Sequence, residues 1–230
     1  MTVGIIAAMD EEVEHLLQYI TEQQKKTVAN CLFIEGKLYE KHIVLLKSGI
    51  GKVNAAMATT ILHEQYNPEV IINTGSAGGY SDELNVGDVV ISDRVVHHDV
   101  DATGFNYDYG QVPGMPLEYK ADQDLIDQTI QAIEKIQSID YEIGTIATGD
   151  SFMDDPKRVA FVRDQFNHMI AVEMEAAAVA QVCYQYQTPF VIIRALSDIA
   201  GKDSTVSFDA FIKKAAKHAS TIVMDTIKTL

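Results

Sequence analysis

Short apolar, strand-like runs alternate with helical patterns along almost the whole chain. The run TVGIIAA, for example, is followed by EEVEHLLQYI, and PFVIIRALSD near the end is followed by a long helical pattern. The strand-like runs are hydrophobic on both faces, which is typical of a mainly parallel sheet that helices cover on both sides. The chain is therefore expected to fold in the α/β class. Strands are expected at residues 2–8, 42–49, 69–79, 88–99, 142–150, 169–173 and 189–198, and helices at 11–20, 52–66, 156–166, 174–186 and 209–230.

Length and composition favour one globular domain. The chain has 230 residues, 47% of them hydrophobic, and contains no low-complexity tract or internal repeat. This composition is that of an ordinary folded protein. We therefore expect a single domain spanning residues 1–230, although the length also allows two small ones.

The charge of the chain excludes several classes of partner. Its 33 Asp and Glu against 18 Lys and Arg give a formal net charge of −15, and the basic residues are scattered. Such a field repels phosphate backbones and anionic lipid, so neither nucleic acid nor a membrane is expected as a partner. A small neutral or cationic molecule suits it better.

Targeting signals are not found in the sequence. The first residues lack a basic region, and their apolar run is interrupted at Asp10, which is unlike a secretion signal. No run approaches the roughly 18 apolar residues of a membrane span. Cys31 and Cys183 have neither metal-ligand spacing nor the density of a disulfide scaffold, so both are expected to be thiols in a reducing compartment. Cytoplasm is the expected location.

Polar residues gather where the expected strands end. Ligands of α/β sheets bind beyond the carboxyl ends of the strands, where the chain leaves the sheet. Five such ends are therefore expected to converge on one site. They carry Asp10-Glu11-Glu12, Ser76-Ala77-Gly78-Gly79, Asp150-Ser151-Phe152-Met153, Glu173-Met174-Glu175 and Ser197-Asp198.

Each of these features also has a purely structural explanation. Acidic residues are favoured in the first turn of a helix by the helix dipole, so the glutamates could be cap residues. Arg194 lies within the apolar run FVIIRAL, and it could form a buried ion pair or turn one donor toward a ligand. The turn NTGSAGG matches neither the dinucleotide fingerprint nor the P-loop. The adjacent His97 and His98 point to opposite faces of a strand, so no metal site is expected.

The segments GIIAAMDEEV, SGIGKVNAA, NTGSAGG, GDVVISD, GFNYDYGQVPG, ATGDSF, AVEMEAAAVAQVC and RALSDIA occur in this order over the whole chain. In these eight segments the sequence resembles the bacterial 5′-methylthioadenosine/S-adenosylhomocysteine nucleosidases, which belong to the nucleoside phosphorylase-like superfamily. The resemblance implies a single three-layer α/β/α domain with a mixed, partly barrel-like central sheet. It also implies a homodimer without a cofactor. The implied reaction is hydrolysis of the N-glycosidic bond of both nucleosides, which releases adenine.

The resemblance also implies roles for the catalytic groups. Asp198 matches the general acid that protonates adenine, oriented by Ser197, and burial would raise its pKa as that role requires. Glu12 matches the base that activates the attacking water, with Ser76 and Arg194 placing that water. Two carboxylates that flank the bond form the arrangement of an inverting glycosidase.

The remaining implied residues bind the substrate. Glu175 matches the carboxylate that accepts hydrogen bonds from the ribose hydroxyls, with Arg194 as its second partner. For Glu173 only the helix dipole offers a role. Phe152 would stack on adenine, and the backbone of Met153 would read its polar edge. The other implied contacts are Gly78 and the Met174 backbone, the apolar Met9, Ile50 and Phe208, and the loop residues Phe105, Tyr107 and Pro113, of which Pro113 would reach the site of the dimer partner.

Three other functions remain open at the level of sequence. A nucleoside phosphorylase would need arginines around the glycine-rich turn, and the first arginine of the chain is Arg94. A nucleosidase for aminodeoxyfutalosine could use the same pocket. A catalytically silent nucleoside sensor would need neither a general acid nor a base, so the combination of Glu12, Glu175 and Asp198 favours an enzyme.

Overall fold

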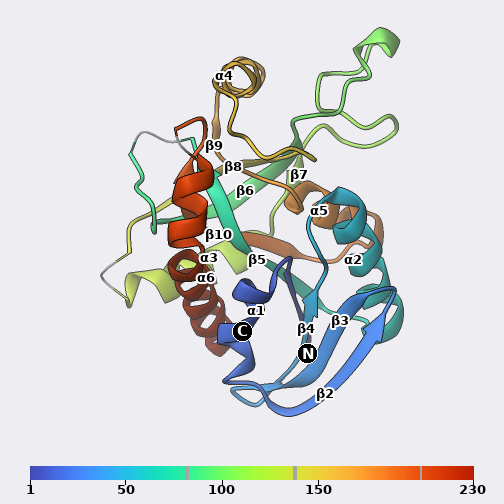
Figure 1. Cartoon of the computed structure of the whole chain (residues 1–230). Helices are drawn as coiled ribbons and strands as arrows, with labels where there is room; N and C mark the ends of the chain where they lie inside the picture. The colour runs from blue at the N-terminus through green and yellow to red at the C-terminus, as the bar shows by residue number, and fades with distance from the viewer. Residues whose placement is uncertain (81–82, 137–138, 203) are drawn as a thin grey trace.

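The computed structural model describes residues 1–80, 83–136, 139–202 and 204–230, without the side chains of 204–206. Strands and helices alternate along most of this chain (Figure 1). The strands are β1 (Thr2–Ala7), β2 (Thr21–Val28), β3 (Cys31–Leu38), β4 (Lys41–Lys47), β5 (Val70–Gly79), β6 (Val89–His97), β7 (Tyr119–Lys120), β8 (Tyr141–Thr148), β9 (Met169–Glu173) and β10 (Phe190–Ile199). The helices are α1 (Asp10–Leu17), α2 (Lys52–Tyr66), α3 (Gln123–Glu134), α4 (Pro156–Gln165), α5 (Ala176–Tyr186) and α6 (Ser204–Thr229), with a 3-10 turn η1 at Thr103–Phe105.

Five of the strands close into a barrel. Strand β5 pairs with β10, β10 with β6, β6 with β8, β8 with β9, and β9 returns to β5. The closing pair is antiparallel and short, at Gly78 and Gly79 of β5. Strands β1, β4, β3 and β2 extend the sheet from the other edge of β5. The expected mixed, partly barrel-like sheet is confirmed.

Helices cover the sheet on two sides. Helix α6 packs on β10 and β5 and also contacts α1 and α3, whereas α2 and α5 pack together on the opposite side. Figure 1 shows α1, α3 and α6 on the left of the sheet and α2 and α5 on the right. Separate hydrophobic clusters fill the two sides, because the central strands are apolar on both faces. The expected three layers are therefore present. No helix within the described ranges is long and apolar enough to span a bilayer.

The sequence patterns missed three of the longer elements, besides the two-residue strand β7 and the turn η1. The hairpin of β2 and β3 and helix α3 were not expected, although the other long elements lie where the patterns put them. Strands β5 and β10 lie within one residue of their expected ranges, but Ser76 and Asp198 lie inside them, whereas the site residues were expected beyond the strand ends. The reason is the barrel, because the last residues of both strands pair with each other, Asp198 with Gly78 and Ile199 with Gly79.

Candidate active site

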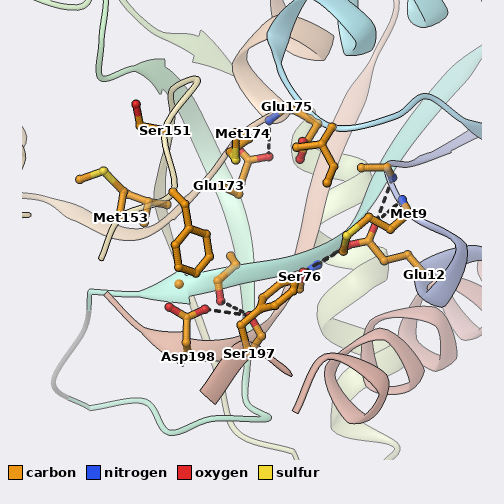
Figure 2. Close-up of a pocket in the computed structure, with 17 residues that line it drawn as sticks. Met9, Glu12, Ser76, Ser151, Met153, Glu173, Met174, Glu175, Ser197 and Asp198 are labelled. Atoms are coloured by element: carbon orange, nitrogen blue, oxygen red, sulfur yellow. Dashed lines mark hydrogen bonds between the residues drawn. The ribbon is translucent and has the colours of Figure 1, made fainter. Parts of the chain in front are cut away.

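A cavity of about 320 Å³ opens between the ends of β1, β5, β9 and β10 and the beginning of α6 (Figure 2). It is lined by Met9, Glu12, Ile50, Ser76, Gly78, Phe152, Met153, Met174, Glu175, Ser197, Asp198 and Phe208, all of which the sequence predicted, and by Ala8, Ala77, Ser151, Val172 and Glu173. Its volume is within the usual range of small-molecule sites. The expected convergence of strand ends on one site is therefore confirmed.

Asp198 is presented to the cavity by an irregularity in β10. The register between β10 and β5 shifts between Leu196 and Asp198, and such bulges re-aim side chains. The Ser197 hydroxyl donates to Asp198 Oδ1 at 2.9 Å, and both residues are almost fully buried. A Cβ at Gly78 would lie 3.1 Å from Asp198 Oδ2, so the bare glycine backbone lets this carboxyl group lie close to β5.

Glu12 is held by four donors. The backbone N–H groups of Ala8 and Met9 donate to Oε2 at 2.8 and 3.2 Å. The backbone N–H and the hydroxyl of Ser76 donate to Oε1 at 3.0 and 3.2 Å. Figure 2 shows Ser76 between Glu12 and Asp198 on the cavity wall. The Glu12 carboxylate is thus fixed at one side of the cavity, with Asp198 at the other.

Gly75, next to Ser76 in β5, makes room for two of the charged groups. Its φ of 152° is a backbone conformation that other residues rarely adopt. A Cβ at this position would come within 2.6 Å of Glu12 Oε1 and would also collide with the guanidinium of Arg194. Position 75 therefore requires glycine for both conformation and space.

Glu175 lies at the N-terminus of α5, with its side chain turned into the site. The Gly51 N–H donates to its Oε1 at 2.9 Å, and Arg194 Nη2 lies 3.5 Å from its Oε2. Burial, together with the neighbouring charge of Glu173, raises the pKa of this carboxyl group, because both disfavour a second negative charge. A polar substrate group that donates to Glu175 would offset that cost.

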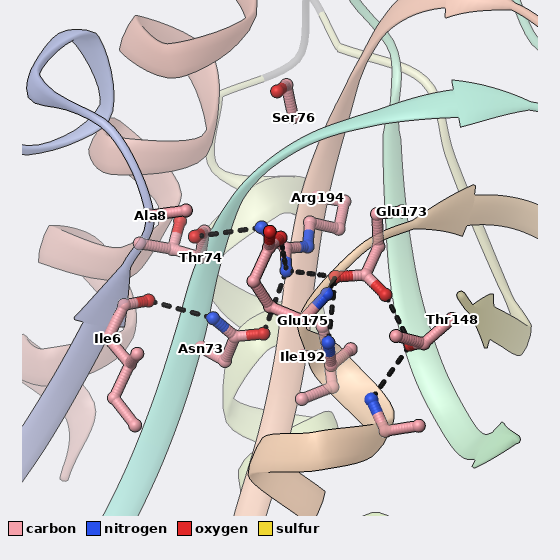
Figure 3. Close-up of polar contacts among 12 residues, drawn as sticks. Ile6, Ala8, Asn73, Thr74, Ser76, Thr148, Glu173, Glu175, Ile192 and Arg194 are labelled. Atoms are coloured by element: carbon pink, nitrogen blue, oxygen red, sulfur yellow. Dashed lines mark hydrogen bonds and ion pairs between the residues drawn. The ribbon is translucent and has the colours of Figure 1, made fainter. Parts of the chain in front are cut away.

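Arg194 forms its main ion pair with Glu173, and both side chains are buried (Figure 3). Its other donors go to Asn73 Oδ1 at 2.9 Å and to the Thr74 carbonyl at 3.1 Å. The predicted pairing of Arg194 with Glu175 is present, at 3.5 Å, although the contact with Glu173 is the shorter one. The predicted turn of an Arg194 donor toward the ligand is not seen. Arg194 does not line the cavity and has only 1% of its side chain exposed, so it supports the floor of the site from beneath.

Glu173 has a larger role than the helix dipole alone would give it. Besides Arg194 it accepts hydrogen bonds from the N–H groups of Glu175 and Ala176, at 2.9 and 2.8 Å, and from the Thr148 hydroxyl. It thereby ties the first turn of α5 to β8 and to Arg194 of β10. Its distance in sequence from Arg194 gives no local signal of this pairing.

Aromatic and apolar side chains close the opposite end of the cavity. The rings of Phe152 and Phe208 meet edge to face, with centroids 5.9 Å apart, and Met153 is buried beside them. The Met153 carbonyl accepts a hydrogen bond from the Gly201 N–H at 3.1 Å. A flat aromatic ligand would fit this end of the cavity.

The predicted loop residues do not reach the cavity of their own chain. Phe105, Tyr107 and Pro113 are absent from its lining. They belong to the segment that follows β6 and extends away from the body of the protein (Figure 1). Phe105 is 82% exposed. The expectation that this loop serves a partner subunit stays a prediction.

No group of three or more His, Cys, Asp and Glu side chains that could hold a metal ion occurs among the described residues. The polar groups of the cavity are instead carboxyl and hydroxyl groups bonded to one another and to backbone N–H groups. They can bind hydroxyl groups and transfer protons.

Known proteins resemble this chain over its full length. The family model described as Phosphorylase superfamily matches residues 2–228. Proteins named 5′-methylthioadenosine/S-adenosylhomocysteine nucleosidase are 57% identical in Oceanobacillus iheyensis and 58% identical in Bacillus thuringiensis, and both alignments cover 100% of each chain.

Solved structures agree with these relatives. The nucleosidase of Neisseria meningitidis, in complex with methylthio-immucillin-A, is 44% identical with a TM-score of 0.98 over 100% of this chain and 99% of that chain. A futalosine hydrolase of Helicobacter pylori is 28% identical, with a TM-score of 0.95 over 100% of this chain and 98% of that chain. This chain therefore belongs to the phosphorylase superfamily and, within it, to the 5′-methylthioadenosine/S-adenosylhomocysteine nucleosidases.

Proposed function

We propose that this chain hydrolyses the N-glycosidic bond of 5′-methylthioadenosine and S-adenosylhomocysteine, with Asp198 as general acid and Glu12 as general base. The products are adenine and either methylthioribose or S-ribosylhomocysteine. The observation that carries the proposal is the pair of buried carboxyl groups on two sides of one cavity, Asp198 bonded to Ser197 and Glu12 bonded to Ser76. Paired carboxyl groups on two sides of a glycosidic bond are the requirement for inverting hydrolysis.

Asp198 acts on the leaving group. Its proton is transferred to N7 of adenine, so the purine departs neutral and the electron pair of the C–N bond leaves with it. The ribosyl carbon then develops oxocarbenium character. The hydrogen bond from Ser197 fixes one oxygen of Asp198, which orients the carboxyl group for this transfer.

Glu12 acts on the nucleophile. A water molecule beside its carboxylate loses a proton to it while the oxygen attacks the ribosyl carbon from the side away from adenine. The four donors around Glu12 hold the carboxylate in one orientation, which favours a productive approach of the water. Arg194 takes no direct part, because it lies behind the cavity wall.

Three residues bind the two ends of the nucleoside. Glu175 accepts hydrogen bonds from the ribose hydroxyls. These bonds offset the cost that burial imposes on the negative charge of Glu175. Phe152 stacks on adenine, and the backbone of Met153 contacts its polar edge. The exposed face of Phe152, which is 41% accessible, is available for that contact.

Water rather than phosphate is the nucleophile in this proposal. The loop after β1, the segment 48–52 and the turn 73–79, which would surround an incoming phosphate, contain no arginine, since the first one in the chain is Arg94. They present Glu12 instead. A carboxylate a few ångströms from a phosphate dianion in a partly dry cleft repels it by several kcal/mol.

The assembly in this proposal is a homodimer of single-domain subunits, each spanning residues 1–230, in the cytoplasm. Exposed apolar side chains support it, because Ile50, which lines the cavity, Val53 and Phe105 are 49%, 78% and 82% exposed. Phe105, Tyr107 and Pro113 of one subunit would then cover the 5′ side of the other subunit's site. The reaction would serve methionine salvage and the activated methyl cycle.

The test is direct. Purified protein is incubated with each nucleoside in phosphate-free buffer, and free adenine and the sugar product are measured. We expect adenine from both nucleosides, an unphosphorylated sugar, and no change when millimolar phosphate is added. A sugar 1-phosphate would establish a phosphorylase instead. Aminodeoxyfutalosine is assayed in parallel, because the Helicobacter pylori relative is named a futalosine hydrolase, and turnover of that compound alone would replace the proposed substrates.

A further inference from the structure

A second, larger cavity adjoins the proposed active site. Its volume is about 570 Å³, and it shares Ala8, Met9 and Ile50 with the first cavity. The shared residues are apolar, and the wall beyond them is polar. We call this second cavity the annex. The active site therefore continues, past Met9 and Ile50, into a space that adenine and ribose do not need.

The annex carries charges of both signs next to each other. Lys47, at the end of β4, places its Nζ 2.6 Å from Asp10 Oδ1, at the beginning of α1. Glu11 lies beside Asp10, and Asn30 and Asn54 are further polar groups of the lining. Both charged side chains of the ion pair keep solvent access, with 28% and 68% of the side chain exposed, so each can still bond a ligand.

The position of the annex fits the 5′ side of the substrate. In the proposed function Glu175 holds the ribose, Glu12 holds the attacking water beside it, and Phe152 and Met153 hold adenine. Met9 and Ile50 remain for the 5′ sulfur, and they are two of the residues that form the passage into the annex. A substituent that continues from the sulfur would enter the annex, whereas a methyl group would end before it.

We propose that the annex binds the amino-acid end of S-adenosylhomocysteine, with the α-carboxylate on Lys47 and the α-ammonium on Asp10 and Glu11. This inference rests on the proposed function and adds a subsite that discriminates between its two substrates. A zwitterion matches a wall on which a lysine lies beside two carboxylates. It also carries no net charge, so the −15 field of the protein does not repel it as it would repel a simple anion.

The experiment compares substrates within single variants. Lys47→Met removes the cation, and Asp10→Asn removes the partner anion without a change of size. Lys41→Met is the matched control, because it removes the same charge from the opposite end of the same strand. Each protein is assayed with S-adenosylhomocysteine, with methylthioadenosine, and with 5′-butylthioadenosine, whose tail is long but uncharged.

We expect Lys47→Met and Asp10→Asn each to lower kcat/KM for S-adenosylhomocysteine by about three- to tenfold, chiefly through KM, as is usual for partly exposed charge contacts. The kcat/KM values for methylthioadenosine and butylthioadenosine should change less than about twofold. Lys41→Met should leave kcat/KM for all three substrates unchanged. Equal losses on all three substrates, or unchanged selectivity, would overturn the subsite. Absence of turnover by the unmodified protein on any adenosine thioether would overturn the proposed function instead.

Discussion

The Arg194–Glu173 ion pair beneath the active site should be essential for stability, and Glu173→Gln is the substitution that tests it. The side chains of Arg194 and Glu173 are only 1% and 3% exposed. Glutamine keeps the size of the side chain and removes its charge. Its amide oxygen can still accept from the N–H groups of Glu175 and Ala176, while its amide nitrogen takes the place of the oxygen that accepts from the Thr148 hydroxyl.

The expected loss of unfolding free energy depends on the partners that Arg194 keeps when Glu173 loses its charge. Removing one partner of a buried pair costs about 3–5 kcal/mol, because the other charge stays buried without compensation. Here Arg194 retains Asn73 at 2.9 Å, the Thr74 carbonyl at 3.1 Å and Glu175 at 3.5 Å. These contacts place the expected loss of unfolding free energy at the low end, about 3 kcal/mol. That is a large part of the roughly 5–15 kcal/mol of a typical domain.

The assay is urea unfolding at neutral pH and one fixed protein concentration, followed by circular dichroism and analysed by linear extrapolation. Glu118→Gln is the control, since it breaks the half-exposed pair with Arg94 and should cost less than about 1 kcal/mol. Arg194→Met and the double variant with Glu173→Gln complete a mutant cycle. The double variant should be more stable than the sum of the single losses by at least about 1.5 kcal/mol. A Glu173→Gln loss as small as that of Glu118→Gln, or strict additivity in the cycle, would refute the reasoning.

Three further predictions concern the carboxyl groups that line the cavity. Asp198→Asn should lower kcat for adenine release by about 10²–10⁴-fold while nucleoside binding, measured by calorimetry, stays within about tenfold; turnover above half of normal would remove Asp198 from the acid role. Glu175→Ala should lose less activity on 2′-deoxy substrates than on ribonucleosides, and equal losses on both would contradict its contact with the ribose hydroxyls. Because the pKa of Glu175 is raised in the folded protein, the folded state binds a proton that the unfolded state releases, so stability falls as pH rises from the ordinary value of 4.5 toward the raised one. Glu175→Gln cannot ionise, so its unfolding free energy relative to the unmodified, ligand-free protein should be higher at about pH 8 than at about pH 5, and an equal difference at both pH values would exclude this linkage.

The sequence predicted those parts of the fold whose signal is local. Central strands such as β1 and β10 are apolar on both faces, so their runs are visible in the chain. The edge strand β2 is almost entirely exposed and shows no hydrophobic pattern, because its pairing with β3 rather than its own burial makes it a strand. Helix α3 did carry a readable signal, since Asp122 accepts from the Leu125 N–H as its N-cap.

Long-range pairing limited the prediction of the site in the same way. Its lining residues were found because strand ends converge in α/β sheets and because the motifs match a known family. The closer partner of Arg194, Glu173, was not found, because Glu173 and Glu175 are two residues apart and only the turn from β9 into α5 decides which one lies nearer the guanidinium. Barrel closure at Gly78 and Gly79 likewise depends on contacts between distant segments.

Position 75 should tolerate no residue other than glycine. Most strand positions accept alanine, but here a single methyl group would meet the Glu12 carboxylate at 2.6 Å and would also displace Arg194. In a saturation library selected for growth on methylthioadenosine, codons other than those for glycine should disappear at position 75 as completely as at the positions of the acid and the base. Gly75 touches no substrate and donates no proton, yet it would then tolerate substitution as poorly as the residues that do. The reason is that the Glu12 carboxylate and the Arg194 guanidinium occupy the space that a side chain at position 75 would need.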